Sequence, residues 1–590
     1  MIMAEEMLRI PYGKTDFAVM RRKGYYYVDK TRFIRDLERE GNFVIFLRPR
    51  RFGKSLMTNV LHVYYDVNYA DEFDDLFAGL DISSNPTEEH NQYLILKFNF
   101  SAVNPAKDKV EESFNGKVLD TLCDFVETYS AYLPEGTLEE VKRYKSCDQA
   151  LNYVFGRVKQ AKQRIYLLID EYDNFANTMM AEDENGYNNL THGDGFFRLF
   201  FNIIKEATTN PDAALDRMFI TGVTPLTLSD VTSGFNIGEN FSLKRDYHEM
   251  IGFSESEVRE MLAYYRDQTG EFHHSVDELI EFMKPWYNNN CFSTDCINDQ
   301  RMFNSDMTLY FIKNYIGRGC KIPEEMIDTN VRSDYNKIRK MVKIDKSFGE
   351  KGRIMQGIFE RKLSNSRVKP EFSLYELQSS ENLPSMLFYM GMLTYGINER
   401  NRPCLVIPNN VVFEQYFRYM DECYKRCLNW YSDLDVVFSL REKLIYDGEA
   451  QPLLNYLCHQ ITTDSSIRDF DPHAEAFIKG FLLAKLGGTN NSYLITTTEP
   501  EENHGYSDLY MEPWNEDCEH SFLIEIKYCN HNAPDSEVAQ KHQEALEQLE
   551  KYSADKALQQ KAEGNGWTLH KLAVVFRGWE CQVCEEVPMR

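Results

Sequence analysis

Hydrophobic and polar residues follow three different patterns along the chain. Between residues 8 and 245, short apolar runs alternate with amphipathic stretches. The runs have the length of buried strands and read NFVIFL, YLILKFNF, RIYLLID and RMFITGV. Because strands that alternate with helices favour a parallel sheet covered by helices, we predict an α/β domain for residues 8–245.

The spacing of apolar residues becomes helical between residues 246 and 460. In SESEVREMLAYYRD and SVDELIEFMKPWY, a serine followed by acidic residues marks the start of a helix. Around residues 380–420 the order changes to helix, strand, turn, strand, helix, which is compatible with a winged helix. We therefore predict a helical middle region that contains this motif.

A third pattern begins near residue 461. The helical stretch HAEAFIKGFLLAKL is followed by strands NSYLITTT, YSDLYME and FLIEIKY, by helix SEVAQKHQEALEQLEKY and by strand HKLAVVF. Residues 461–590 are therefore expected to form a separate α/β domain. A chain of 590 residues exceeds what one hydrophobic core supports, which agrees with a division into several domains.

The composition is that of a folded protein without a membrane span. The chain is 43% hydrophobic and 27% charged, and its apolar runs are far shorter than the roughly 20 residues of a membrane helix. The N-terminus, MIMAEEMLRIPYGKTDF, has early acids and no apolar core of signal-peptide length. We expect a cytoplasmic protein that does not enter a membrane.

Cysteine spacing and net charge narrow the range of ligands. Cys581 and Cys584 form a single CxxC, and without a second pair at zinc-site spacing we expect plain thiols. The formal net charge of −26 opposes nonspecific binding to a phosphate backbone. Chemistry on a nucleic acid would therefore depend on a local basic groove, on metal ions or on a partner.

The stretch FLRPRRFGKS, residues 46–55, ends as a phosphate-binding loop ends. Gly53 allows close approach of a phosphate, Lys54 would reach the β- and γ-phosphates, and the Ser55 hydroxyl would bind magnesium. An apolar run precedes the loop and a helical stretch follows it, which is the order that this chemistry needs. Arg48 stands where the loop normally has its first glycine, so a basic surface turn is the alternative interpretation.

Acidic residues follow a later apolar strand. RIYLLIDEYD ends in Asp170, which would hold magnesium through its water shell, and Glu171, which would orient or deprotonate the attacking water. The alternative is a pair of acids that only keeps a strand end soluble. At the end of RMFITGVTPL, Thr221 and Thr224 could sense the γ-phosphate, or be hydroxyls bonded to the backbone.

The segments IPYGKTDF, YYYVDKTRFI, FLRPRRFGKS, LLIDEYDN and FITGVTPL, in this order, resemble the AAA-ATPase-like domain family. Members of that family also carry an arginine-rich loop without the first glycine. The resemblance implies a P-loop NTPase fold that binds ATP and Mg²⁺ with the lysine, serine and acids named above. It leaves open whether Arg50, Arg51 or an arginine of a neighbouring subunit completes the site, and so whether the chain forms a homo-oligomer.

A second group of chemically active residues lies in the C-terminal region. Glu525 and Lys527 share one face of the strand FLIEIKY, and Asp508 begins the preceding strand. Antiparallel pairing would let the two carboxylates hold one Mg²⁺ or Mn²⁺ ion, while Lys527 positions water and stabilises phosphoryl charge. Glu475, on the helix before these strands, would support the metal as a third acid. The alternative is a strand face that is merely solvated.

After these strands, Gln548 and Tyr552 lie four residues apart on one helical face, where they could line a substrate path. This order of elements resembles the PD-(D/E)XK nuclease superfamily, in the branch fused to AAA-ATPase-like domains. The resemblance covers residues 461–577 and implies a restriction-endonuclease-like fold. The segment HGYSD has fewer arginines than in many relatives, which weakens the case for backbone contacts near Asp508.

Two hypotheses of function follow from these observations. In the first, the chain is a P-loop ATPase whose nucleotide turnover regulates a metal-dependent nuclease acting on a nucleic acid of unknown type. In the second, the ATPase is a switch and the nuclease-like domain is a scaffold or a non-catalytic interaction module. Residues 461–590 hold 23 acidic and 11 basic residues, a net charge of −12 that favours the second hypothesis.

Overall fold

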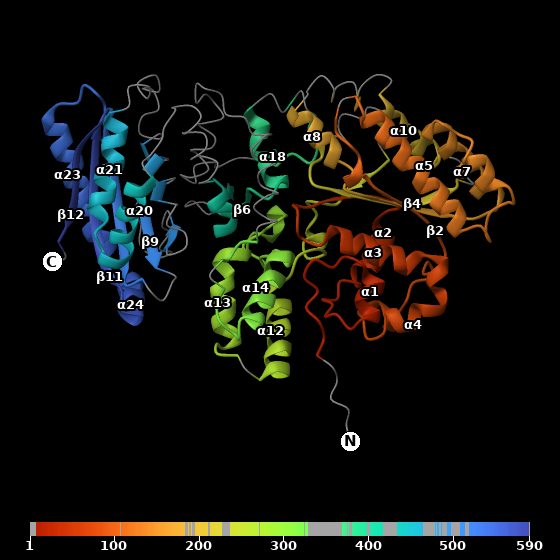
Figure 1. Cartoon of the computed structure of the whole chain (residues 1–590), viewed down its shortest axis with the longest axis horizontal. Helices are drawn as coiled ribbons and strands as arrows, with labels where there is room; N and C mark the ends of the chain where they lie inside the picture. The colour runs from red at the N-terminus through yellow and green to blue at the C-terminus, as the bar shows by residue number, and fades with distance from the viewer. Residues whose placement is uncertain are drawn as a thin grey trace. The chain divides into compact units, whose positions relative to one another are not determined.

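The structure is a computed structural model of the whole chain (Figure 1). It describes residues 7–106, 108–182, 187, 190–191, 195–209, 213–226, 237–270, 272–323, 325–328, 368–373, 376, 380–397, 402–416, 434–463, 478–479, 481–482, 485–486, 493–496, 508–513 and 518–588. These residues form two compact units. The first unit contains the described residues up to 409, and the second contains those from 410 onward.

A parallel five-stranded sheet forms the centre of the first unit, with strand order β2-β3-β4-β1-β5. Its strands are β1 (Phe43–Leu47), β2 (Leu94–Asn99), β3 (Ile165–Asp170), β4 (Leu215–Gly222) and β5 (Glu239–Asn240). The first four coincide with the predicted apolar runs and are almost entirely buried. The predicted parallel α/β fold is therefore confirmed.

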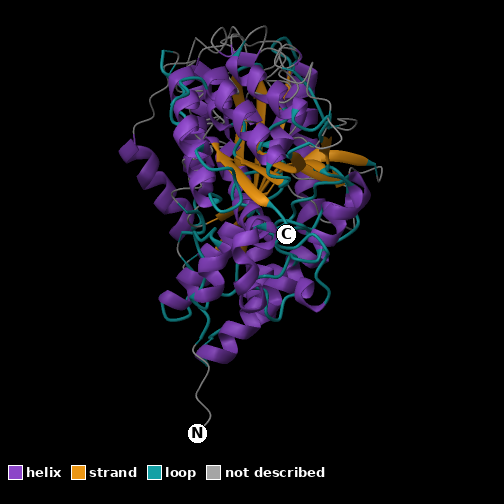
Figure 2. Ribbon diagram, turned by 90° about the vertical axis from the view of Figure 1, so that its right-hand side faces the viewer, coloured by secondary structure: helices purple, strands orange, loops and turns teal. Residues whose placement is uncertain are grey.

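Helices enclose this sheet, as Figures 1 and 2 show. They are α1 (Phe17–Arg22), α2 (Phe33–Glu40), α3 (Lys54–Tyr65), α4 (Phe73–Leu76), α5 (Val110–Thr128), α6 (Thr137–Val141), α7 (Cys147–Gln160), α8 (Asn174–Glu182) and α10 (Phe196–Glu206). Their apolar faces bury large aromatic side chains against the strands, which is the main source of stability for such a layered fold.

The predicted helical region continues in the first unit with α12 (Glu255–Thr269), α13 (Val276–Tyr287), α14 (Ser305–Gly317) and α18 (Leu383–Tyr389). Ser254 and Ser275 begin α12 and α13 with capping boxes, as their sequence predicts. After α18, the hairpin of β6 (Thr394–Ile397) and β7 (Pro403–Val406) leads into helical residues 410–416. A helix, two antiparallel strands and a helical segment thus follow one another in the predicted order.

The second unit has a mixed five-stranded sheet, with strand order β12-β11-β10-β9-β8. The strands are β8 (Tyr493–Thr496), β9 (Leu509–Pro513), β10 (His520–Cys529), β11 (Thr568–Arg577) and β12 (Glu580–Val587). Only the β10–β11 pair is parallel. The helices are α20 (Leu434–Glu442), extended by a π turn (Lys443–Asp447), α21 (Ala450–Thr463), α23 (Asp535–Ser553) and α24 (Lys556–Asn565).

Contacts group α20 and α21 with the C-terminal sheet, on which α21 packs along β12. Helices α12 to α18, by contrast, belong with the parallel sheet. The helical middle region that the sequence predicts for 246–460 is therefore divided between the two units. The helix α23 packs on β10 and β11, and covers the face of β10 that carries Leu523.

Arg48 explains how the chain leaves β1 without the usual glycine. Its guanidinium is buried between the rings of Phe46 and Phe292, 4.3 and 4.2 Å from their centroids. It donates to the carbonyl oxygens of Ser242 (2.5 Å) and Tyr247 (3.0 Å). Burial lowers the pKa of Arg48 to about 9, which still leaves the group cationic at neutral pH. The arginine thus points into the core and fixes β1 to the segment that follows β5.

We predict that Arg48→Ala destabilises the first unit by about 3 kcal/mol, because carbonyls that accept from a charged donor lose their partner in a buried site. The exposed Arg143, paired with Glu140 at 2.7 Å, provides the matched control, and Arg143→Ala should cost less than about 1 kcal/mol. Urea unfolding, with hydrogen exchange of the β1 amides to locate the effect, checks this. Equal stability of the two variants would contradict the structural role.

Candidate functional site: a phosphate-binding loop and a carboxylate–lysine centre

The loop between β1 and α3 has the backbone of a phosphate-binding turn. Gly53 has φ +101°, a left-handed conformation that favours glycine, and its carbonyl accepts from Met57 N (3.1 Å) in the first turn of α3. Lys54 and Ser55 then begin the helix, so that its N-terminal amides lie at the loop. A helix N-terminus with free amides is suited to an anion.

Lys54 is directed into the loop. Its side chain is buried, and Nζ donates to the carbonyl oxygens of Arg48 and Pro49, each at 2.9 Å. Burial lowers the pKa of Lys54 to about 8, and the negative charges of Asp170 and Glu171 oppose this shift. The ammonium therefore lies in a desolvated loop, where it interacts with the charges of Asp170 at the end of β3 and of Glu171 directly after it.

The predicted acid and hydroxyl meet at the carboxyl edge of the sheet. In the sheet, β4 lies between β1 and β3. Asp170 is the last residue of β3, and Thr221, near the end of β4, lies opposite Phe46 of β1. Asp170 Oδ1 and Thr221 Oγ1 are both buried, and neither has a hydrogen-bond partner among the described residues. Buried polar atoms without partners are rare in folded proteins, and they indicate a site for a ligand, ion or water.

Glu171 follows directly, with φ +51°, a conformation uncommon for a residue other than glycine. Burial raises the pKa of its carboxyl group, and Asp170 adds to the effect, whereas Lys54 and Arg50 oppose it. Such a carboxyl group is suited to accept a proton from water.

Thr224 has a structural role instead. Its backbone N and Oγ1 donate to the buried Asp173 carboxylate at 2.8 and 3.1 Å. Asp29, in the segment YYYVDKTRFI, likewise caps the turn at Thr31, whose N and Oγ1 donate to it at 2.8 and 2.7 Å. These contacts satisfy Thr224 and Asp29 within the chain.

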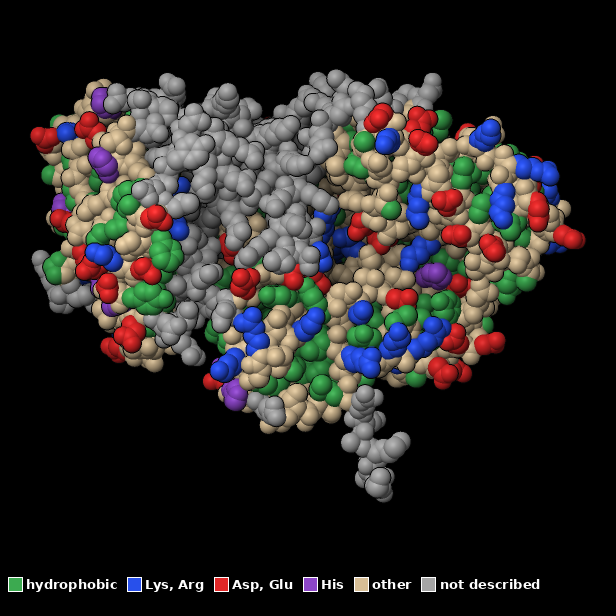
Figure 3. Space-filling model, viewed as in Figure 1, with side chains coloured by type: hydrophobic (Ala, Val, Ile, Leu, Met, Phe, Trp, Pro, Cys, Tyr) green, Lys and Arg blue, Asp and Glu red, His purple; other side chains and the backbone are tan. Residues whose placement is uncertain are grey.

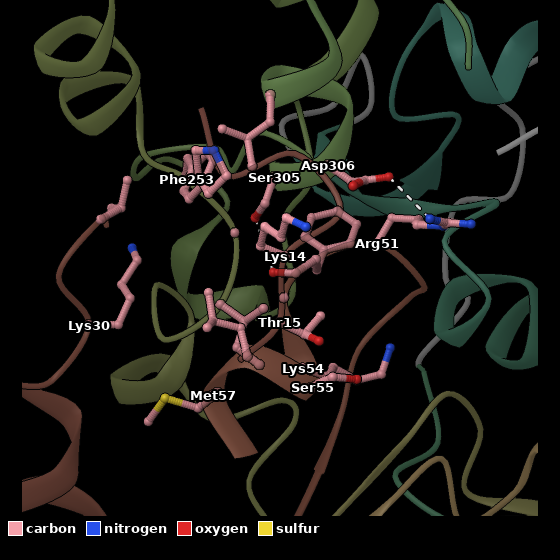
Figure 4. Close-up of a pocket in the computed structure, with 18 of the residues that line it drawn as sticks. Lys14, Thr15, Lys30, Arg51, Lys54, Ser55, Met57, Phe253, Ser305 and Asp306 are labelled. Atoms are coloured by element: carbon pink, nitrogen blue, oxygen red, sulfur yellow. Dashed lines mark hydrogen bonds and ion pairs between the residues drawn. The ribbon is translucent and has the colours of Figure 1, made fainter. Parts of the chain in front are cut away.

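A pocket of about 580 Å³ opens beside the loop (Figure 4). Lys14, Thr15 and Ser55 contribute polar atoms to its wall. The apolar part of the wall is formed by Met20, Tyr26, Met250, Ile251, Phe253 and Met261. Met20 and Tyr26 precede β1 in the chain, and Met261 lies on α12. The other three side chains belong to residues 250–253. The pocket therefore joins a phosphate-binding loop to an apolar chamber.

The loop is tied to the helical part of the same unit. Arg51 Nη1 lies 3.3 Å from Asp306 Oδ2, an ion pair seen in Figure 4, and Arg51 O accepts from Asp306 N (3.2 Å). The carbonyl oxygen of Phe52 accepts from Gly252 N and from Ser305 Oγ, each at 3.1 Å. A movement of the loop backbone would thus displace the start of α14, to which these bonds connect it.

The second site lies in the second unit, where β9 and β10 pair as predicted. Leu509 is opposite Ile524, so that Asp508 lies beside Glu525. Asp508 N donates to Glu525 Oε2 (3.2 Å), and Ile526 N donates to Asp508 Oδ2 (2.8 Å). Lys527 Nζ lies 2.6 Å from Glu525 Oε1. Alternation along β10 and antiparallel pairing thus bring the three predicted residues together.

A fourth charged group joins this centre. Lys479 Nζ lies 2.9 Å from Asp508 Oδ1. Burial, and next to it the charge of Asp508, raise the pKa of Glu525 to about 7, while Lys527 opposes the shift. Lys479 was not predicted as a site residue, although its position four residues after Glu475 in the sequence is a signal of a shared helical face.

The helix α23 closes one side of the centre. Tyr552 is buried there, and its pKa is raised to about 12, first by burial and then by the charges of Glu525 and Asp508. Gln548 Oε1 is buried and has no hydrogen-bond partner within the described part of the chain. The two residues expected to line a substrate path therefore lie on the helix that covers these strands. Glu475 lies outside the described residues.

The sequence also predicts a divalent ion at the second centre, plain thiols at Cys581 and Cys584, and no membrane span. Within the described ranges, no three His, Cys, Asp or Glu side chains are arranged to hold a metal ion, so the second centre presents two carboxylates there. Cys581 and Cys584 are free cysteines in contact with the thiol of Cys458. Every described helix is too short or too polar to cross a membrane.

Comparisons with known proteins assign a domain family to each of the two regions that contain these residues. Residues 11–232 match the family model described as predicted AAA-ATPase, and residues 473–586 match the model of the PD-(D/E)XK nuclease superfamily. A relative from Azotobacter chroococcum mcd 1, described as an uncharacterized protein in the vnfD 5′ region, is 26% identical over 332 residues. That match covers 50% of this chain and 57% of the relative's length. The chain thus joins an AAA-ATPase-like domain to a C-terminal PD-(D/E)XK nuclease superfamily domain.

Proposed function

We propose that the first unit binds ATP with Mg²⁺ and hydrolyses it. The observation that carries this proposal is the pair of buried, unpartnered oxygens, Asp170 Oδ1 and Thr221 Oγ1, at the strand ends near Lys54. A carboxylate, a hydroxyl and an ammonium beside a helix N-terminus fit a magnesium-bound triphosphate. The apolar chamber of the adjoining pocket fits a nucleotide base.

The residues divide the work as follows. Ser55 and Asp170 would hold Mg²⁺, which when bound neutralises phosphate charge. Lys54 would exchange its two carbonyl acceptors for phosphate oxygens, and Glu171 would orient water and accept its proton. Thr221 would contact the terminal phosphate.

Among the loop arginines, we place Arg50 at the phosphates. Arg48 is held in the core and Arg51 by Asp306, whereas Arg50 donates to Asn174 (3.1 Å) beside Glu171 and interacts electrostatically with both Lys54 and Glu171. A guanidinium there would stabilise charge that develops during phosphoryl transfer.

For the second unit we propose metal-dependent hydrolysis of phosphodiester bonds in a nucleic acid. Asp508 and Glu525 would hold Mg²⁺ or Mn²⁺, with Glu475 as a third ligand, and the ion would supply Lewis-acid stabilisation of the phosphate. Lys527 would position water and stabilise the phosphoryl oxygens. ATP turnover in the first unit would regulate this hydrolysis.

A specific observation supports the alternative, in which this unit is a non-catalytic interaction module. Both carboxylates are already paired with lysines, Asp508 with Lys479 and Glu525 with Lys527. On the face drawn in Figure 3, acidic side chains lie among the basic ones of the described surface. Such a mixed surface binds a long phosphate backbone weakly.

The nucleotide proposal predicts different effects for two substitutions. Lys54→Ala should weaken ATP binding by about 10- to 100-fold, because charged hydrogen bonds to phosphate are lost. Glu171→Gln should preserve binding and lower turnover by about 100-fold or more, because proton transfer is lost. Calorimetry with ATP and Mg²⁺, and phosphate release, measure the two effects. Unchanged ATP affinity in Lys54→Ala would refute the proposed nucleotide site.

The nuclease proposal predicts that Lys527→Ala lowers phosphodiester cleavage by about 100-fold or more, since a cation beside the scissile phosphate is removed. Labelled single- and double-stranded DNA and RNA are incubated with Mg²⁺ or Mn²⁺, with and without ATP. Lys561, paired with Glu512 on the same sheet at 2.7 Å, provides the control Lys561→Ala, which should cleave normally. Wild-type cleavage by Lys527→Ala would favour the interaction-module alternative, as would absence of cleavage by the wild type.

A further inference from the structure

The carboxylates of the second site each have one oxygen tied to the backbone. Asp508 Oδ2 accepts from Ile526 N (2.8 Å), and Glu525 Oε2 accepts from Asp508 N (3.2 Å). The oxygens Asp508 Oδ1 and Glu525 Oε1 carry the two lysine contacts instead. These two oxygens are therefore the ones that a shared divalent ion would use at least cost to the strands.

The two lysines hold these oxygens differently. Lys527 lies on the same strand as Glu525, two residues away, and its side chain is 17% exposed. Lys479 reaches Asp508 from a separate helical segment, 29 residues away in sequence, and its side chain is 27% exposed. A long, flexible lysine stem that approaches from another element can withdraw without disturbing the paired strands.

The charges of the described side chains favour such a withdrawal. With both acids ionised, Lys479, Asp508, Glu525 and Lys527 sum to zero, so these four groups together have no net charge to attract a divalent cation. An ammonium 2.9 Å from Asp508 Oδ1 also repels an ion that binds the same oxygen. Movement of Lys479 away from Asp508 restores a negative site.

We propose that Lys479 is a metal-responsive positioning residue. It neutralises Asp508 while the centre lacks a divalent ion, and it moves to a phosphate oxygen of the substrate when an ion binds Asp508. The ammonium then contributes affinity for a phosphodiester, a chemistry to which lysine is suited as a point charge. The inference rests on the proposed nuclease function of this centre.

The first test measures metal binding by the full chain, using electron paramagnetic resonance of free Mn²⁺. Lys479→Met keeps the length of the side chain and removes its charge, so it should bind Mn²⁺ about tenfold more tightly than the wild type, a gain of the size of one lost charge repulsion. Lys561→Met removes the charge of a lysine on α24 that is paired with Glu512 of β9, and it should leave Mn²⁺ affinity unchanged. Lys479→Arg retains the charge and should bind Mn²⁺ as the wild type does.

The second test uses bis(4-nitrophenyl) phosphate as a phosphodiester probe at saturating Mn²⁺. Lys479→Met should raise KM about tenfold with little change in kcat, because the contact serves binding in both the ground and transition states. Lys479→Arg should restore KM. If Lys479 had only a structural role, its removal would lower Mn²⁺ affinity and would not raise KM while leaving kcat unchanged.

The outcomes separate the inference from the function on which it rests. Suppose that Asp508→Asn weakens Mn²⁺ binding, so that the ion does bind at this centre. If Lys479→Met then binds Mn²⁺ no more tightly than the wild type, the role of Lys479 is overturned and the metal centre stands. Mn²⁺ binding that is absent, or unaffected by Asp508→Asn, overturns the metal centre and the inference with it.

Discussion

Burial of ionisable side chains is the constraint on which both sites depend. Lys54 lies in a desolvated loop near Asp170, and Glu525 is buried beside Lys527. A buried charge without a partner is costly, so each of these groups needs compensation from fixed dipoles, from an opposite charge or from a ligand. The loop carbonyls and the β9–β10 amides supply part of it. Asp170 Oδ1 is left without a partner among the described residues, and we propose that a triphosphate and its cation bind there.

Arg48 shows how the first unit forms the turn after β1 without a glycine at that position. Its side chain is directed into the core and anchors the end of β1, so the turn is set by a buried guanidinium instead of by backbone freedom. Gly53, which the phosphate would approach most closely, keeps its left-handed conformation. The arginines that follow are consequently available for other tasks: Arg51 joins the loop to α14, and Arg50 lies beside the acids.

Local patterns predicted the parts of the structure that local physics determines. Apolar runs identified four of the five strands of the parallel sheet, and the two-residue period of β10 placed Glu525 and Lys527 on one face. The wall formed by residues 250–253 could not be predicted, because it depends on how distant segments pack around the loop. The same holds for Lys479, whose contact with Asp508 is tertiary, and for the division of the middle helices between two units.

The central claim is that Lys54, Asp170 and Glu171 form a site that binds the triphosphate of a nucleotide. A crystal structure of the full chain with Mg²⁺ and a non-hydrolysable ATP analogue tests it most directly. The account predicts that Lys54 Nζ leaves the carbonyl oxygens of Arg48 and Pro49 for the β- and γ-phosphates, and that Asp170 and Thr221 gain partners. Lys54 still bonded to those carbonyls, with the analogue bound elsewhere or not at all, would contradict it.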